Sequence, residues 1–495
     1  MNKIRFLCSC LLLSGSLCTY AQFVPVTRNA NIATSDNFPV NAGGLSYYVR
    51  ASAYGFGQDE GESGSENYDF ASTFAEAGIR ANYKWGFVDG YIIVAAEGRL
   101  RYGQYFNGKL HNDNQSGIPL NTNGRYETTF DLRDLYVGYR GRKWEVLLGN
   151  QNIQWGRGMG SNPTNNLSAS DLFFLSAGAD DGRMYNFMLS ADYQINKGLD
   201  LQIVGVPLVQ TSKMPLQLFN LGGLSLKEQA VPEAKIKNGA IAARLNLSGQ
   251  QSGMSISYFN GYDPFPTLRA GFVNNDPSSG EAEGGTVVYR KQTIGADFSY
   301  GIPGNPRTGH SVPSNSWSVF GEFGYNIYKK ENGVKNIQDN FAFNLGARRM
   351  IYMRNNVDMF MASVAWYGKY TPNFRELTHN TSDMDVYLYE TNLVMGRFFN
   401  GQQRPLDHSM MLVLSQSVAK QKFNFSLMYS LGLIKPLDFT GTVEGDRNMM
   451  LNVQGVYNIS NNLSLTAGYK RMFGSTSKMY GPVMGGAFAE LKARF

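Results

Sequence analysis

Segments with alternating apolar and polar residues are joined by connections that are long and short in turn. This pattern constrains the fold more than any other feature of the chain. Within residues 143–208, a strand-like segment leads into a long irregular connection that opens with Trp-Gly-Arg-Gly at 155–158. Two more strand-like segments follow, joined by the tight turn 196–198. Long loops on one side and short turns on the other are typical of a membrane-spanning antiparallel β-barrel.

The same pattern recurs along the chain and predicts an all-β, transmembrane antiparallel β-barrel of about eighteen strands. The predicted strands are 44–57, 68–84, 88–106, 125–140, 143–154, 184–195, 198–209, 236–248, 252–262, 290–302, 315–329, 340–353, 357–370, 407–419, 422–434, 447–459, 463–473 and 484–495. Short turns are expected at 85–86, 141–142, 196–198, 354–356, 421 and 460–462. The connection 303–314 is longer than its place in the alternation requires, so a barrel of about sixteen strands stays open.

The last predicted strand shows which residues would face water and which would face lipid. In residues 487–495, Glu490, Lys492 and Arg494 fall on one face, and the residues between them are apolar. Turning the charged face to lipid would cost roughly 2–4 kcal/mol for each basic residue near the midplane, so this face is expected to line the lumen. Aromatic residues beside the short turns are expected to form a girdle at headgroup depth. They are Tyr83, Trp85, Phe87, Tyr139, Trp144, Tyr193, Tyr352 and Tyr457.

The N-terminus has the pattern of a secretory signal peptide. A basic start precedes an apolar run over 6–17, and small residues at 19 and 21 permit cleavage before Gln22. A lipid anchor on Cys18 is disfavoured because the preceding Leu17 is too large for the usual lipidation pattern. We therefore expect a signal peptide at 1–21, a periplasmic or lumenal segment at 22–43, and the barrel at 44–495.

Composition argues against several other classes of protein. The formal net charge of +6 is mild and does not indicate nucleic-acid binding. The four histidines are scattered and all three cysteines lie in the leader, so neither a metal site nor another cofactor is expected. His408 beside Ser409 lacks an evident acidic partner, and the glycines at 156–160 are not followed by the Lys of a phosphate loop. No enzymatic activity is predicted.

Charged residues of both signs fall on the predicted inner face. By alternation, these are Glu76, Arg80, Glu97, Arg99, Arg101, Asp134, Asp192, Arg244, Asp297, Glu322, Arg348, Glu490, Lys492 and Arg494. Rings of arginine favour anions in pores. Neighbouring acids and bases can equally form structural ion pairs between strands, and the mixture of signs favours this second interpretation.

Part of the chain resembles porin-like outer-membrane β-barrel proteins of Gram-negative bacteria. The resemblance lies within 131–207 and rests on Gly-Asn-Gln-Asn-Ile-Gln-Trp-Gly-Arg-Gly at 149–158, followed by Asn-Pro-Thr at 162–164. The alternating end of the chain, closing on Phe495, is similar to the C-terminal signature by which the assembly machinery recognises outer-membrane barrels. The resemblance implies a passive channel in the outer membrane, with short periplasmic turns and long extracellular loops.

In porins the third long loop folds into the lumen and narrows it, and residues 155–183 form the third long loop of this chain. Its glycines permit tight turns, and Ser168 is predicted to cap a short helix over 169–177. We expect Trp155, Arg157, Asp171 and Arg183 to line a pore constriction. The alternative is a folded external cap that makes no contact with solutes.

The sequence thus predicts a multi-pass outer-membrane channel for the passive passage of small polar or charged solutes. Expected partners are outer-membrane lipid, the solutes themselves, and the assembly machinery through Phe495. A homo-oligomer or a complex with other outer-membrane proteins is left open. The alternative function is a non-conducting barrel subunit of an outer-membrane assembly or export complex, which would bind partners through loops 210–235, 263–289 and 371–406.

Overall fold

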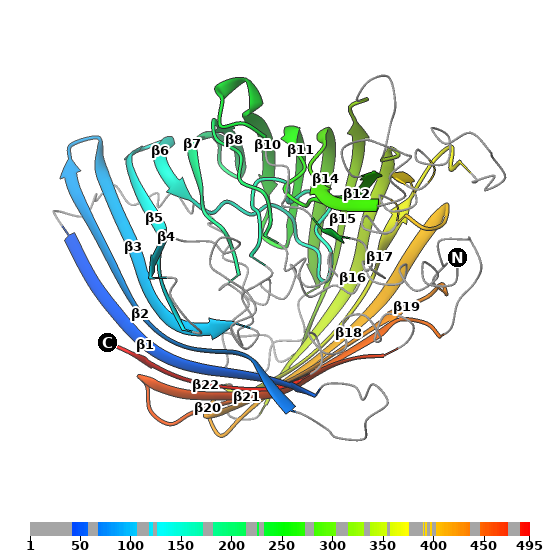
Figure 1. Cartoon of the computed structure of the whole chain (residues 1–495). Coiled ribbons are helices and arrows are strands. Elements are labelled where there is room, and N and C mark those ends of the chain that lie inside the picture. Colours follow the sequence, from blue (N-terminus) through cyan, green and yellow to red (C-terminus); the bar gives the residue numbers. More distant parts are fainter. Residues whose placement is uncertain are drawn as a thin grey trace.

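The strands of the chain close into one antiparallel β-barrel in the computed structural model (Figure 1). The structure describes residues 42–57, 68–105, 118–121, 126–171, 182–213, 225–226, 232–272, 282–302, 315–330, 337–353, 357–375, 390, 392–393, 397, 402–435, 446–473 and 486–495. The expected signal peptide and almost all of the segment at 22–43 lie outside these residues.

Eighteen of the strands in this described part of the chain form the barrel. They are β1 (Ala42–Gly57), β2 (Tyr68–Phe87), β3 (Gly90–Tyr105), β5 (Glu127–Gly141), β6 (Trp144–Gln151), β7 (Asn186–Asn196), β8 (Leu199–Val206), β10 (Ala240–Ser248), β11 (Ser252–Tyr262), β14 (Arg290–Ile302), β15 (Asn315–Tyr328), β16 (Asn340–Tyr352), β17 (Met359–Tyr370), β18 (Leu406–Val418), β19 (Phe423–Gly432), β20 (Met449–Asn458), β21 (Leu463–Phe473) and β22 (Gly486–Arg494).

Each barrel strand pairs with its neighbours in order, and β1 pairs with β22 to close the barrel. At this seam, Tyr47 and Phe495 exchange backbone hydrogen bonds of 3.0 and 2.8 Å. The prediction of about eighteen strands is confirmed, with ends that shift by a few residues. The sixteen-strand alternative is wrong, because β14 and β15 flank residues 303–314 as separate strands and pair along their length.

Among the described residues, four short strands and the short helix η6 were not predicted. The strand β4 (Ile118–Asn121) pairs with β5 alone. The strands β9 (Ser225–Leu226), β12 (Thr267–Phe272) and β13 (Ala282–Val287) form a small separate sheet. The 3₁₀ helix η6 (Ile236–Asn238) replaces the start of the strand expected at 236. These pieces are too short for a period of two to show in the sequence.

The turn expected at 85–86 is wrong. The strand β2 continues through Phe87, pairing Trp85 with Ile92 and Phe87 with Gly90, so that the turn comprises residues 88–89. Trp85 and Phe87 both stay exposed on the outer face, which preserves the alternation. A Cβ on Gly90 would lie 2.4 Å from the carbonyl oxygen of Arg140, so glycine permits the close approach there. The turn expected at 354–356 lies outside the described residues.

The two faces of the wall differ as the alternation predicts. Along β22, Ala487, Ala489 and Leu491 are exposed, whereas Phe488 and Glu490 are buried. Large apolar residues are likewise exposed on the outer face elsewhere around the barrel, for example Ile79, Ile256, Ile294 and Phe425. Among the described residues, no helix is long and apolar enough to cross a membrane.

Candidate functional site

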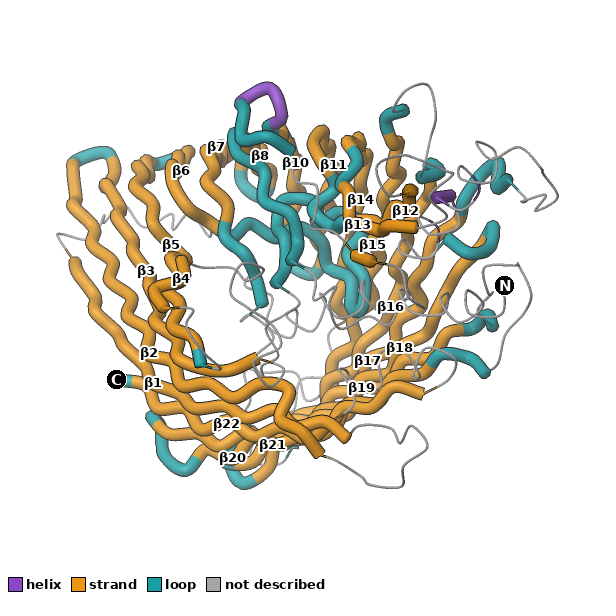
Figure 2. Tube along the Cα trace, in the orientation of Figure 1, coloured by secondary structure: helices purple, strands orange, loops and turns teal. Residues whose placement is uncertain are grey.

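The described first part of the connection between β6 and β7 lies against the inner face of the barrel. This part, residues 152–171, is called the inner loop below. Ile153, Trp155 and Leu167 of the inner loop are buried in one apolar cluster with side chains of the wall. The wall residues are Met188 of β7, Val204 and Val206 of β8, Ala242 of β10 and Phe259 of β11. Figure 2 shows loop segments inside the barrel beside these strands.

Between these apolar anchors, residues 157–166 form an arm that crosses the wall as far as β17 and β18. The Nδ2 of Asn344 donates hydrogen bonds of 2.5 Å to the carbonyl oxygens of both Met159 and Ser161. Met159 Sδ lies 3.1 Å from the hydroxyl of Ser363 on β17. Gly160 has a φ of +83°, and a Cβ there would lie 2.4 Å from Met411 Cε on β18. The arm is therefore fitted closely to the inner face.

Trp155 and Arg157 meet in one polar network on this wall. Trp155 Nε1 donates a 2.6 Å hydrogen bond to Gln202 Oε1, and Arg244 lies over the indole ring at 5.9 Å. Arg244 pairs with Asp297 at 2.8 Å, and Asp297 also accepts a 2.6 Å hydrogen bond from Arg157 Nε. The side chain of Arg157 is 26% exposed, whereas that of Asp297 is buried. Arg157 is thus the part of this network that water reaches most readily.

Asp171 and Arg183 lie at a different place, where the loop returns towards β7. Isolated bridges join Ser170 to Arg183 and Asp171 to Lys213. Ser168 caps no helix, so that expectation is wrong: its hydroxyl donates to the carbonyl oxygen of Ile153, and residues 168–171 are extended or irregular. The rest of the expected helix lies outside the described residues. At residues 170 and 171, backbone pairing takes the place of the expected first turn of the helix.

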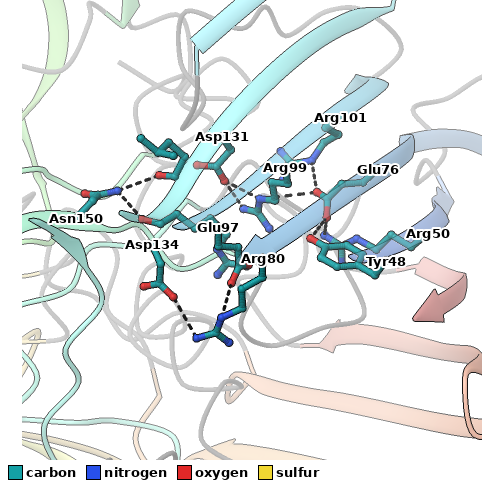
Figure 3. A network of polar contacts seen from close by, with 12 residues as sticks. Tyr48, Arg50, Glu76, Arg80, Glu97, Arg99, Arg101, Asp131, Asp134 and Asn150 are labelled. Atoms are coloured by element: carbon teal, nitrogen blue, oxygen red, sulfur yellow. Dashed lines mark hydrogen bonds and ion pairs between the residues drawn. The ribbon is translucent and has the colours of Figure 1, made fainter. Parts of the chain in front are cut away.

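A second polar network lies on β1, β2, β3 and β5 (Figure 3). Its centre is Glu76, which pairs with Arg50 at 2.7 Å and Arg101 at 3.0 Å and accepts a 2.7 Å hydrogen bond from Tyr48. Arg99 bonds Asp131 at 2.6 Å. Opposite charges that are this close cancel most of each other's field, and removing one partner of such a buried pair is costly.

The remaining predicted inner-face charges are distributed around the wall. Arg80 lies 3.8 Å from Glu97 and 3.4 Å from Asp134. Arg348 lies near the ring of Phe320 at 6.0 Å, and Lys492 near that of Tyr48 at 4.8 Å. Three more residues have the following environments: Asp192 is opposite Gln202 and Glu145, Glu490 is buried 3.5 Å from Arg50, and Arg494 is exposed at the chain end.

Glu322 is the exception among these charges, because the inner loop covers it. Its side chain is 0% exposed, and four donors of the loop surround the carboxylate. It therefore presents no charge to water.

Sequence reasoning missed several polar residues of these networks. Arg50 obeys the same alternation as the residues that were found, since Ser52 and Tyr54 of β1 are buried on the same face, so the signal was available. Asp131 could not be assigned to the inner face by alternation. The pairing of β3 with β5 shifts register between Ala96 and Gly98, and this shift breaks the alternation along β5. The Nδ2 of Asn150 donates to the carbonyl oxygens of Leu132 and Arg133 beside this irregularity.

A further buried polar cluster fastens the chain just after β11. Asp263 accepts 2.9 Å hydrogen bonds from Lys291 Nζ and from the Tyr328 hydroxyl. Burial alone would raise the pKa of Asp263, but the ammonium of Lys291 and the donated hydrogen bonds outweigh it and hold that pKa below its ordinary value. The cluster fixes the root of the connection that leads to β12.

The arrangement around His408 does not suit a hydrolase. His408 Nδ1 accepts a 2.9 Å hydrogen bond from Trp366 Nε1, whereas Ser409 is buried on the opposite face of β18. Throughout the described ranges, no group of three or more His, Cys, Asp or Glu residues is placed to hold a metal ion.

The fold belongs to a recognisable class, that of the large closed antiparallel β-barrels. Among solved structures, OccAB1 of Acinetobacter baumannii is similar with a TM-score of 0.52 and 9% identity, over 92% of this chain and 96% of that chain. OccK8 (OprE) of Pseudomonas aeruginosa has a TM-score of 0.50 and 11% identity, over 92% of this chain and 97% of that chain. OccD3 (OpdP) of Pseudomonas aeruginosa also has a TM-score of 0.50, with 9% identity over 92% of this chain and 91% of that chain.

No family model matches the chain, and no curated protein matches it in sequence. At identities this low the structural likeness defines the fold. For the fold, the structural likeness confirms the resemblance to porin-like barrels.

Proposed function

We propose that the protein is an outer-membrane channel for the passive passage of small polar or charged solutes. The observation that carries the proposal is the inner loop, which is fastened to the wall inside a closed barrel from β7 to β18. A barrel of about eighteen strands is wide enough to enclose an aqueous channel. An exposed apolar outer face around a polar inner face supports its placement in lipid.

In this proposal the inner loop forms the constriction. Arg157 and Arg244 line its narrow part, whereas Trp155 and Asp297 are buried behind them and anchor the loop to the wall. Arg183 lines the return of the loop beside residues 211–213, where Asp171 is buried. The close fit between arm and wall supports a fixed narrowing rather than a loosely attached external cap.

The charge selectivity of the channel is proposed to be weak. Most inner-face charges are paired, as Glu76 is with Arg50 and Arg101. Paired charges leave a small net field for a passing ion. The side chains of Arg157 and Arg80 are 26% and 51% exposed, so both cations can act on solutes in the lumen.

Solute entry into proteoliposomes tests the proposed function. Liposomes holding the purified barrel should swell in isosmotic solutions of small sugars and amino acids, at rates that fall as the solute grows. Liposomes without protein serve as the control. Swelling no faster than this control with every solute would contradict a channel.

Two partner predictions accompany the channel. Phe495 is exposed and stacks on Tyr47 at 5.2 Å, so it is accessible for recognition by the assembly machinery. Association with itself or with other outer-membrane proteins stays a prediction. The alternative of a non-conducting subunit has no specific observation in its favour among the described residues, and large parts of its three binding loops lie outside them. The proposal assigns no catalytic activity to the chain.

A further inference from the structure

We infer that Glu322 is the positioning residue of the constriction, because its buried carboxylate holds the inner loop on the wall and sets where Arg157 stands. The inference rests on the proposed function. It adds a residue that positions the loop and does not itself line the lumen. Glu322 lies in the middle of β15 and shares its inner face with Phe320 and Gly324.

The two oxygens of the carboxylate are divided between the two ends of the arm. Oε2 accepts hydrogen bonds from the backbone N–H groups of Arg157 at 2.9 Å and Gly158 at 2.8 Å. Oε1 accepts from the N–H and the hydroxyl of Thr164, both at 2.8 Å. A single side chain therefore joins residues that are separated by a turn of the loop.

An ionised carboxylate suits this position because it offers acceptors only. Hydrogen bonds to a charged group are roughly twice as strong as those between neutral groups. A glutamine has the same shape but carries an N–H₂ group in place of one oxygen. That group would face the N–H groups of either Arg157 and Gly158 or Thr164, so at least one end of the arm would lose its acceptor.

Glycines in the loop and on the wall make the contact possible. Gly156 has a φ of +100°, and a Cβ there would lie 2.4 Å from Glu322 Oε1. On the wall, a Cβ on Gly324 would lie 2.9 Å from the carbonyl oxygen of Pro163, and one on Gly295 would lie 2.7 Å from Thr164 Cγ2. The glycine backbone of β14 and β15 thus forms the surface against which the arm packs.

The position of Arg157 follows from the same contact. Its backbone N–H is held by Glu322, while its side chain reaches Asp297 and the hydroxyl of Ser299 at 2.9 Å. If the backbone bond to Glu322 is lost, Arg157 is held only by the contacts of its side chain with Asp297 and Ser299, and its backbone can shift. Glu322 then governs the ion selectivity of the channel without touching a solute.

Hydrogen exchange of the reconstituted barrel tests the contact without reference to conduction. Glu322→Gln should raise the exchange rate of the 157, 158 and 164 amides by about tenfold or more, while the amides of β14 and β15 stay protected. Glu490→Gln is the matched control, since Glu490 is also buried on the inner face but lies on β22. It should leave exchange at 157–164 unchanged. Unchanged exchange in Glu322→Gln would overturn the inference.

Ion selectivity provides a second measurement. It should change if Glu322 sets the position of Arg157, and it should stay the same if Glu322 only holds the loop on the wall. In planar bilayers under a salt gradient, Glu322→Gln should shift the reversal potential and increase the open-channel current noise relative to the wild type. An unchanged reversal potential with raised amide exchange would show that Glu322 holds the loop without setting selectivity, which contradicts the inference. A wild type that carries no current would instead contradict the proposed channel, and the exchange result would stand.

A reversible cross-link separates loss of the contact from damage to the fold. An ideal Cβ on Gly295 lies 3.4 Å from Thr164 Cβ, close to the roughly 3.5–4.5 Å of a disulfide. Thr164→Cys removes the close methyl group, and the remaining close neighbour is the hydroxyl of Ser257 at 2.5 Å, which can rotate away. With Thr164→Cys and Gly295→Cys added to Glu322→Gln, oxidation should restore the wild-type reversal potential and reduction should remove it again. A reversal potential that does not respond to the redox state would overturn the inference even if Glu322→Gln assembles poorly.

Discussion

Alternation assigned single residues to a face of the wall, but it did not reveal their partners. Glu490 and Leu491 were placed correctly because neighbouring residues of a strand point to opposite sides. The partners come from distant parts of the chain: Arg50 pairs with Glu490, and Arg157 with Asp297. Burial was also hidden from the sequence, since Glu322 obeys the alternation and yet lies beneath the inner loop.

A pair of neighbouring substitutions tests the faces at residue scale. Leu427→Arg should impair assembly, because it places a charge in hydrocarbon at a cost of roughly 2–4 kcal/mol near the midplane. Ser426→Arg should leave assembly intact, because it adds the charge to the inner face. The yield of folded barrel in the outer-membrane fraction measures both. Equal tolerance of the two changes would mean that the register is shifted by one residue.

The exposure of Arg157 leads to a second prediction at this scale. Arg157→Glu should raise the cation-to-anion permeability ratio by roughly two- to fivefold, because a charge in a narrow pore acts within the screening length of about 8 Å. Reversal potentials in a salt gradient measure the ratio. Arg142→Glu, on an exposed turn, is the control and should have little effect. An equal shift in both variants would place Arg157 outside the ion path.

At the scale of elements, the barrel strands could be predicted and the inner loop only in part. Each strand is long enough for a period of two to show, and each short turn marks where two strands meet. The strands β9, β12 and β13 are short and lie within long connections, so no period could show. The glycines at 156, 158 and 160 indicated a compact inserted loop, but the helix expected over 169–177 does not begin after Ser168, because residues 170 and 171 pair with the backbone of other segments.

Shortening the arm tests the role of this element. Trp155 and Leu167 belong to one apolar cluster, so replacing residues 157–166 by two glycines should leave both anchors in place. Conductance should rise by roughly twofold or more, since the open cross-section of the narrow part grows. Single-channel currents in planar bilayers compare this variant with the wild type. Equal currents would mean that the arm does not narrow the ion path.

At the scale of the whole molecule, closure explains how a chain of this composition is stable. The pairing of β1 with β22 leaves no open edge in the barrel, so backbone groups at membrane depth are satisfied within the sheet. Alternation and turn parity were enough to predict this closure. The fit of a loop to the inner wall depends on contacts across many strands, which a single sequence does not reveal.

Closure predicts a specific behaviour on gels. The purified barrel should migrate faster in detergent when unheated than after boiling, because the closed sheet resists unfolding. A far-ultraviolet circular dichroism spectrum should show β-structure throughout the same samples. Identical migration before and after heating, together with a helical spectrum, would contradict the fold.

Single-channel recording in planar lipid bilayers tests the central claim most directly. Barrel that has passed the heating test should give discrete current steps in the wild type and larger steps when residues 157–166 are shortened. If neither the wild type nor the shortened variant gives current steps at any voltage that the bilayer withstands, although both preparations are folded, the result would contradict a channel.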